Sequence, residues 1–344
     1  MGVVVPRPVR YAVLAALLVL ARVALASACV ADGDCNDHNA CTSDRCSASI
    51  CQHTVVLCSD GDPCTTDTCS PATGCMHAAP RVCDDGNPCN GYEACDPAGG
   101  CRPGAPPFFS RRGGHVGNGA VVEQDLAANN PSATIAIGKG AQLLAGTTLT
   151  ADTSKLGVSA SIFNLRSNSR HFGVGATVAG SVATAQLPVV DGFCPMAAQA
   201  CGGTDVVLDR NATAGPLLPG SYGRVVLPND TTLLLLPGTF DFCSVKGGRG
   251  ATIRVLGASP TTVRVVGNFQ LGGNSAFVPL AGTPPPTLEV GGTAVHIGAT
   301  ARVQAWVTAP HAGLRLSRSA EFDGTFCSDL MGVDNNVRLT CTAP

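Results

Sequence analysis

Cysteines are the residues of this chain whose number and spacing most directly imply chemistry. Thirteen of the 18 cysteines lie between Cys29 and Cys101, and five are spread over the rest of the chain. In an oxidising compartment so dense a block forms disulfides, which stabilise units too small to bury an apolar core. Zinc is the competing interpretation, because His53 and His77 each follow a cysteine by two residues. The gaps of four and five residues between cysteines disfavour zinc, whose sites commonly pair cysteines as Cys-x-x-Cys.

The cysteine block contains three similar units of four cysteines each. The units are Cys35, Cys41, Cys46 and Cys51; Cys58, Cys64, Cys69 and Cys75; and Cys83, Cys89, Cys95 and Cys101. We expect these twelve cysteines to form disulfides within their own units, and three connectivities are open in each unit.

Among the five later cysteines we also expect disulfides, between cysteines that are close to each other in the sequence. Cys194 is predicted to pair with Cys201, and Cys327 with Cys341, which leaves Cys243 and Cys29 unassigned. Because 13 and five are both odd, complete oxidation requires one disulfide between the two regions. Otherwise each region keeps one free or lipidated thiol.

Aspartates recur in the loops between cysteines, and their oxygens would suit calcium. The calcium candidates are Asp60, Asp62, Asp84 and Asp85. The alternative, which we favour, is that these residues form Asx-turns, since Asp, Asn and Gly tolerate the backbone angles of tight loops. The loops also lack the 12-residue ligand order of an EF-hand. We therefore expect no cofactor, with calcium at these loops as the alternative.

Two carboxylates near the C-terminus raise the question of catalysis. Glu321 and Asp323 point to the same side of a predicted strand, and such a pair could perform general acid and base chemistry on a glycan. The simpler interpretation is a solvated strand face in which Arg302, one coil away, pairs with Glu321. The chain contains no glycine-rich phosphate loop, no His-Glu-x-x-His motif and no nucleophile elbow. We therefore expect a protein without catalytic activity.

Export is predicted by the N-terminus. Arg7 and Arg10 precede an apolar run that is too short to span a bilayer, and small residues at Ala26-Ser-Ala28 suit a signal peptidase. Residues 1–28 are therefore predicted to be a signal peptide, and the protein to be secreted or on the outer cell surface. Cleavage after Ala28 would make Cys29 the first residue, so a lipid anchor on Cys29 is an alternative. The formal net charge of −2 gives no reason to expect a nucleic acid partner.

The cysteine-rich block resembles a known repeat. The segment Asp60-Gly-Asp-Pro-Cys-Thr-Thr-Asp-Thr-Cys69, followed by Gly74-Cys75-Met-His77, is similar to the slime-mould Cys-Thr-Asp-Cys repeat of extracellular matrix and sheath proteins. The first unit shares Thr42-Ser-Asp-Arg-Cys46, whereas the third has Asn90 in place of the threonine. The resemblance implies an extracellular structural or adhesive module and carries no catalytic residues.

After the Pro- and Gly-rich segment 102–118, which we expect to be a linker, apolar residues recur in pairs eight positions apart. The pairs are Ile135 and Leu143, Val225 and Leu233, Val245 and Ile253, Phe269 and Phe277, Val295 and Val303, and Leu314 and Phe322. From Val225 to Leu314 the first members are 20, 24, 26 and 19 residues apart. A repeat of this length, made of short strands and small turn residues, predicts a β-solenoid in which the pairs stack. A β-sandwich is the alternative.

The predicted fold is thus all-β: a right-handed parallel β-helix over residues 119–344, preceded by small disulfide-rich repeats over residues 29–101. The segments Leu218-Pro-Gly-Ser-Tyr, Leu236-Pro-Gly-Thr-Phe and Trp306-Val-Thr-Ala-Pro resemble solenoid domains of bacterial surface and pilus-associated proteins, with a rhythm similar to ice-binding adhesins and bactofilins. The predicted function is structural or adhesive, with extracellular matrix, a glycan or another surface protein as partner. A polysaccharide-binding or polysaccharide-degrading β-helix is the alternative.

Overall fold

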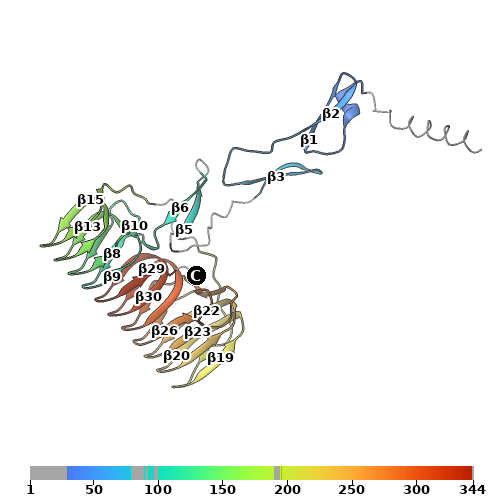
Figure 1. Cartoon of the computed structure of the whole chain (residues 1–344). Helices are drawn as coiled ribbons and strands as arrows, with labels where there is room; N and C mark the ends of the chain where they lie inside the picture. Colours follow the sequence, from blue (N-terminus) through green and yellow to red (C-terminus); the bar gives the residue numbers. More distant parts are fainter. Residues whose placement is uncertain are drawn as a thin grey trace, which may run out of the picture. The chain divides into compact units, whose positions relative to one another are not determined.

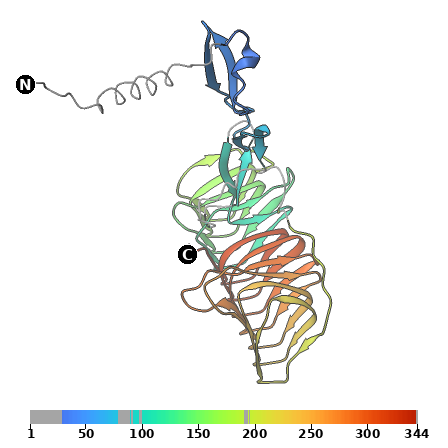
Figure 2. The ribbon, with the colours of Figure 1, turned by 90° about the vertical axis from the view of Figure 1, so that its right-hand side faces the viewer.

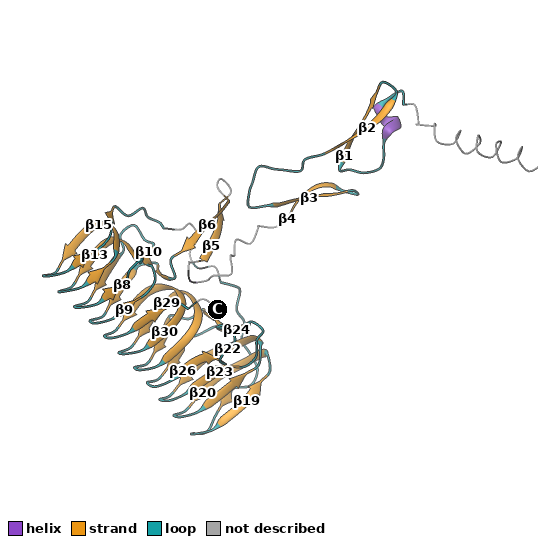
Figure 3. Cartoon of the chain, in the orientation of Figure 1, coloured by secondary structure: helices purple, strands orange, loops and turns teal. Residues whose placement is uncertain are grey.

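The computed structural model describes residues 29–78, 89, 92–96, 100–189, 194 and 196–342. The chain forms two compact units, Met1–Cys83 with Cys95–Arg102, and Asp84–Ala94 with Pro103–Pro344. The first holds disulfide-rich repeats and the second a β-solenoid (Figure 1, Figure 3). The predicted signal peptide, residues 1–28, lies outside the described residues. Within the described part, no helix has the length and apolar character needed to cross a membrane.

The repeats are built on antiparallel hairpins. A short 3₁₀ helix, η1 (Asp32–Cys35), precedes the first hairpin. The hairpins are β1 (Thr42–Ser47) with β2 (Ile50–Val55), β3 (Thr66–Ser70) with β4 (Gly74–Ala78), and β5 (Tyr92–Asp96) with β6 (Gly100–Ala105). Tight turns need residues that accept positive φ, and Ala48, Ser49 and Gly74 take that conformation at two of the turns.

Disulfides pass from one repeat to the next, so the expectation of pairing within units is wrong at several cysteines. Cys35–Cys51 and Cys58–Cys75 do join the first and fourth cysteines of a unit. The second cysteine of a unit instead bonds to the third cysteine of the following unit. These bonds are Cys41–Cys69 and Cys64–Cys95.

The same pattern explains both ends of the repeat block. Cys46, a third cysteine, has no unit before it and bonds to Cys29. Cys89, a second cysteine, has no unit after it. It bonds to Cys341, which directly follows the last strand of the solenoid in the sequence. Cys341 therefore takes the position that a fourth repeat would supply. Cys83 lies outside the described residues, as does the side chain of Cys101.

The solenoid consists of one 25-stranded sheet whose neighbouring coils pair in parallel, which excludes the β-sandwich. Its first half contains β7 (Phe108–Ser110), β8 (Gly113–Val116), β9 (Val121–Val122), β10 (Leu126–Ala128), β11 (Thr134–Ile137), β12 (Gln142–Leu143), β13 (Thr148–Leu156), β14 (Ser161–Ile162), β15 (Asn164–Phe172), β16 (Thr177–Val178) and β17 (Val182–Ala183). Its second half contains β18 (Val206–Val207), β19 (Thr213–Leu217), β20 (Gly220–Leu227), β21 (Thr232–Leu235), β22 (Gly238–Gly247), β23 (Thr252–Val255), β24 (Thr261–Val265), β25 (Phe269–Leu271), β26 (Ala276–Pro279), β27 (Thr287–Val290), β28 (Ala294–Ile297), β29 (Arg302–Leu316), β30 (Glu321–Val333) and β31 (Arg338–Thr340).

The predicted core pairs stack as expected. One column runs through Val225, Val245, Phe269, Val295 and Leu314, and each residue is in register with the next. The second runs through Leu233, Ile253, Phe277, Val303 and Phe322. All of these residues are buried. Alternate residues point outward, which is the period-2 rule of a strand, so each coil buries its apolar residues against the coils above and below.

Every coil turns a corner with the same short pattern, which the sequence reasoning had missed. The corner is a run of four residues, in which the third has positive φ and the fourth points inward and is alanine, serine or threonine, except for Val337. The third residues are Asn211, Asp230, Gly250, Asn274, Thr300, Ser319, Asn336, Gly119, Gly140, Ser159 and Gly175. The backbone N–H of Thr300 donates to Arg318 of the next coil, that of Ser319 to Asn335, and the rest of the column continues likewise from Asn211 to Ser159. This ladder offsets the cost of the left-handed conformation for residues other than glycine.

The order of coils in space differs from their order in the sequence. The first half of the solenoid begins at β7 in the middle of the stack and continues through β10 and β13 to β17 at one end. The second half begins at β18 at the opposite end and returns coil by coil to β30 in the middle. β30 then pairs with β7 and β8, and β31 pairs with β9. We call this junction, β30 and β31 against β7, β8 and β9, the seam. Figure 2 shows the two halves stacked as one column, with the first residues of the solenoid near its middle.

The seam shows that residues 102–118 are not simply a linker. Phe108 is fully buried, is in register with Phe326, and stacks on that ring at a centroid distance of 5.2 Å. The Pro- and Gly-rich composition that suggested a linker instead reflects the turns of the first coil. Gly113 and Gly114 have positive φ where the next coils approach closely, and a Cβ there would overlap backbone atoms.

A crossing segment, residues 184–205, connects the two ends of the solenoid and is attached to it at three of its described residues, Val189, Cys194 and Cys201. Val189 N–H donates to Asn129 Oδ1 at 2.7 Å. Cys194 bonds to Cys327 on β30, and Cys201 bonds to Cys243 on β22. The predicted local pairs, Cys194 with Cys201 and Cys327 with Cys341, are therefore wrong, because each cysteine of the crossing segment bonds to the coil that it passes.

Replacement of Phe277 by alanine tests the stacked core. Phe277 is fully buried between Ile253 and Val303, so Phe277→Ala should lower the free energy of unfolding by about 3–5 kcal/mol through the cavity it leaves. Denaturant unfolding under non-reducing conditions measures this. The control is Arg302→Ala, an exposed residue of the adjoining coil, which should cost about 0–1 kcal/mol. Equal and small effects of both changes would contradict the stacking.

The disulfide pattern predicts a distinct peptide map. Non-reducing digestion followed by mass spectrometry should recover peptides that link Cys41 to Cys69, Cys64 to Cys95, and Cys89 to Cys341. Peptides that link Cys41 to another cysteine of the first unit would refute passage from repeat to repeat. A sample reduced before alkylation serves as the control and should lose all cross-linked species.

Candidate functional site

The titratable side chains that lie closest together in the described repeats form a cluster in the first one. His53 Nδ1 lies 2.7 Å from Asp44 Oδ1 and 3.4 Å from Asp37 Oδ2. Asp37 also accepts from the Thr42 hydroxyl, at 3.0 and 3.1 Å to its two oxygens, and from the Asn39 N–H at 2.9 Å. The hairpin brings Asp44 and His53 together, because they are directly opposite each other on β1 and β2.

The second repeat contains the same cluster. His77 Nδ1 lies 2.7 Å from Asp67 Oδ1 and 3.5 Å from Asp60 Oδ2, and Asp67 is opposite His77 on β3 and β4. The Thr65 hydroxyl lies 3.1 Å from Asp60 and 3.2 Å from Asp67. The threonine and aspartate of the Cys-Thr-x-Asp-x-Cys motif are thus the residues that bind the loop to the hairpin. Sequence reasoning noted both histidines as metal ligands and did not find these aspartate partners.

The electrostatics favour a charged cluster. The hydrogen bond that His53 donates to Asp44 raises the pKa of His53 above 6.5, and the one that His77 donates to Asp67 raises the pKa of His77 likewise. The same hydrogen bonds lower the pKa of Asp44 and of Asp67 below 3.8. A raised histidine pKa contributes stability below pH 6.5 that is lost as the pH rises through the folded value. A lowered aspartate pKa contributes stability above pH 3.8 that is lost on acidification. The clusters therefore stabilise the repeats most between about pH 4 and 6.5.

Each cluster also offers the donor set of a small metal site. In Asp37, Asp44 and His53, and in Asp60, Asp67 and His77, the three ligand atoms lie within 4.8 Å of one another. A divalent cation would need the lone pair of the imidazole Nδ1, which in both clusters lies 2.7 Å from an aspartate oxygen. The predicted calcium ligands serve as turn caps: Asp60 Oδ1 accepts from the Asp62 N–H and Asp62 Oδ1 from the Cys64 N–H, each at 2.8 Å. Asp84 and Asp85 lie outside the described residues, and calcium binding stays a prediction.

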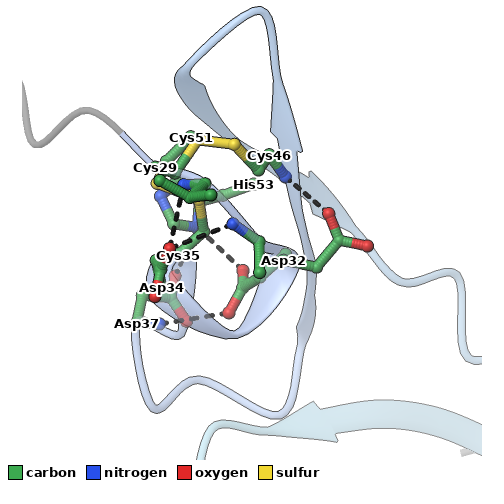
Figure 4. Close-up of a disulfide and its surroundings, with 11 residues drawn as sticks. Cys29, Asp32, Asp34, Cys35, Asp37, Cys46, Cys51 and His53 are labelled. Carbon is green, nitrogen blue, oxygen red and sulfur yellow. Dashed lines mark hydrogen bonds and ion pairs between the residues drawn. A yellow bond between two sulfur atoms is a disulfide. The ribbon is translucent and has the colours of Figure 1, made fainter.

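Cys29 is held within the first repeat. Its sulfur bonds to Cys46, and the neighbouring Asp34 carboxylate accepts from the N–H groups of Val30 and Ala31 at 2.9 and 3.0 Å (Figure 4). Asp32 accepts from the Cys46 N–H at 2.8 Å. A lipid thioether on Cys29 would need the sulfur that this disulfide uses. The structure therefore disagrees with the alternative of a lipid anchor on Cys29.

The carboxylate pair near the C-terminus of the chain, Glu321 and Asp323 on β30, lies on an open strand face. Glu321 is exposed, and its register neighbours are Arg302 on one side and Arg338 on the other. Asp323 Oδ1 accepts from the Thr342 N–H at 2.7 Å, which ties down the chain after the last strand. Glu321 and Asp323 do share a side of β30, as predicted.

A row of basic side chains on another face was not predicted. Lys246, Gln270, His296 and Arg315 follow one another in register on β22, β25, β28 and β29. Lys246, Gln270 and His296 line a hollow of about 350 Å³ together with Leu271, Ala299, Ser317 and four glycines. In the sequence, each of these residues directly follows the first apolar residue of a core pair and therefore points outward. The row was not predicted because the overall charge of the chain is near zero.

Comparisons with known proteins agree with the repeats. Residues 34–56 and 57–79 match the family described as the Dictyostelium (slime mold) repeat, which confirms the resemblance predicted for the first two units. A crystal structure of an ice binding protein from an Antarctic bacterium, Flavobacteriaceae, is similar with a TM-score of 0.29 and 12% identity, over 70% of this chain and 82% of that one. No curated protein matches the chain.

Titration of the two histidines tests the clusters. In NMR spectra, His53 and His77 should each show a pKa above 6.5, and Asp44→Asn should bring that of His53 down while leaving His77 unchanged. Asp67→Asn is the matched variant and should act on His77 alone. A pKa of 6.5 or below for both histidines in the unmodified protein would contradict the charged cluster. Added calcium should leave both titrations in place; a calcium-dependent drop would instead support ligation.

Proposed function

We propose that this chain is a secreted or cell-surface protein with a structural or adhesive role and no catalytic activity. One observation carries the proposal: disulfides run from repeat to repeat and end on Cys341 at the last strand of the solenoid. A covalent series of this kind resists unfolding where chaperones and reducing agents are absent. It suits a protein that holds a binding surface in place outside the cell.

The cysteine content supports an extracellular location. Disulfides persist in oxidising compartments and are rare in the cytosol, and no free cysteine occurs among the described residues. The two repeats that match the Dictyostelium (slime mold) family are cross-linked to each other by Cys41–Cys69. Such cross-linking gives the repeats a rigidity that their exposed hairpins, with few buried apolar residues, do not supply.

The carboxylates of the solenoid support a role without catalysis. Glycoside hydrolysis needs two carboxyl groups that flank the bond to be cleaved, one of them protonated. Glu321 lies on an exposed face between two arginines in register, and Asp323 accepts a backbone hydrogen bond from Thr342. The residues that line the hollow beside the basic row include no carboxylate. A polysaccharide-degrading β-helix is therefore the less favoured alternative.

Assays on a panel of polyuronates and neutral glycans separate the two functions. We expect no depolymerisation by the full-length protein and the same result for the Glu321→Gln/Asp323→Asn double variant. Turnover by the unmodified protein that this double variant abolishes would overturn the structural role. Ser319→Ala, at the corner of the same coil, is the control for indirect effects of substitution. Protease treatment of intact host cells should release or degrade the protein, whereas full protection would contradict a surface location.

A further inference from the structure

The basic row lies on an exposed face of the solenoid strands β22, β25, β28 and β29. The crossing segment is fixed to Cys243 and Cys327 on other stretches of β22 and β30. The basic row instead occupies the outward positions just before the corner. In spatial order these positions are Val226, Lys246, Gln270, His296, Arg315 and Gly332. Lys246, His296 and Arg315 are exposed.

A second column runs beside this row along the corner. Its members are the second residues of the corner pattern, in the order Arg249, Gly273, Ala299 and Arg318. Because Gly273 and Ala299 are small, the surface is hollow over the two middle coils. The hollow of about 350 Å³ is lined by Gln270, His296 and Ser317 together with glycine backbone.

The charges frame this hollow at both ends. Lys246 and Arg249 belong to the coil below it, and Arg315 and Arg318 belong to the coil above it. These coils are three steps apart, about 14 Å at a spacing of ~4.8 Å between strands. His296 lies between them, with Nε2 3.0 Å from the Ser317 hydroxyl.

Few acidic groups oppose these cations. Asp334 Oδ2 lies 3.4 Å from Arg315, and the same carboxylate lies 4.0 Å from His115 across the seam. Asp230 lies at the corner next to Gly250. The four Lys and Arg side chains thus exceed the nearby carboxylates, although the whole chain is nearly neutral. Clefts that carry one sign of charge concentrate ligands of the opposite sign.

We propose that this hollow binds a linear acidic polysaccharide, with its carboxylates or sulfates on the two cation pairs and its hydroxyls on Gln270 and Ser317. The proposal rests on the adhesive role argued above and names what the surface adheres to. The register of the coils places one cation pair at each end of the hollow and the polar side chains of Gln270 and His296 between them, which suits a polymer that carries both acidic groups and hydroxyls. Nucleic acid is disfavoured, because single strands are bound by stacking on several aromatic side chains, and the lining of the hollow includes no Phe, Tyr or Trp.

Binding of the full-length protein to polygalacturonate, at low and at moderate salt, tests the proposal. We expect binding that weakens as salt rises, because exposed charges are screened. The Lys246→Ala/Arg315→Ala variant should bind at least tenfold more weakly. Arg254→Ala, an exposed arginine on β23 that faces a different side, is the matched control and should bind as the unmodified protein does. Thermal unfolding of all variants should be unchanged, since these side chains are exposed.

Two further probes decide between ligand classes. Neutral dextran should not bind, and a single-stranded oligonucleotide of equal charge should bind more weakly than the polyuronate. Equal loss for Arg254→Ala, tighter binding of the oligonucleotide, or no binding of any polyanion would each overturn this site. A failure here would leave the adhesive role standing, because that role is judged by surface location and by the absence of glycan turnover.

Discussion

The solenoid depends on the seam, where strands from the end of the chain pair with strands from its beginning. In a solenoid each coil is stabilised by its two neighbours, and the coil of β7, β8 and β9 has one neighbour from each half of the chain. Without β30 and β31, two short stacks would each end in exposed apolar residues. Phe108 shows this directly, because its ring packs against both Phe322 and Phe326.

Charged groups fix the register of the seam. Asp329 is almost fully buried and pairs with Arg111 and Arg112, which follow the first strand of the solenoid. Burial alone would raise the pKa of this carboxyl, but the two guanidinium groups outweigh burial and hold the pKa below its usual value. Arg338 pairs with Glu123 in the same way one corner further on, at 2.5 Å. Since removing the partners of a buried charge is costly, the two arginines beside buried Asp329 disfavour a slipped register, while the exposed Arg338–Glu123 pair contributes little.

Closing the seam brings together residues more than 200 positions apart, and the disulfides reduce what this closure costs. Loop closure loses more entropy as the loop grows. Cys194–Cys327 and Cys89–Cys341 both join early or middle segments to the last coils. The crossing segment therefore acts as a cross-linked brace along the coils it passes, as well as a connection between the two ends.

The sequence predicted the stacking because inward positions must be apolar in every coil. The spacing of eight between Phe269 and Phe277 or Val295 and Val303 reflects that requirement, and the observed register follows it. Disulfide partners could not be predicted in the same way, because they depend on which hairpin or coil lies against which. Cys46 and Cys51 are opposite each other on one hairpin, yet each bonds to a cysteine outside it. The seam could not be predicted for the same reason, since nothing in the order of the coils along the chain indicates that the first coil lies in the middle of the stack.

The stacking also explains where function can reside. Inward positions are restricted to apolar residues, and corner positions to residues that accept positive φ or fit inside the turn, as Gly250 and Ala251 do. Outward positions alone are free to differ between coils. On β30 and β31 they carry Glu321 and Arg338, which alternate in charge with their neighbours. On β22 and β29 they carry Lys246 and Arg315 without such alternation. Asp334 pairs with Arg315 at one end of the row, whereas the inward and corner requirements place no demand on Lys246 at the other end, so the composition of this outward row is left free by the stability of the fold.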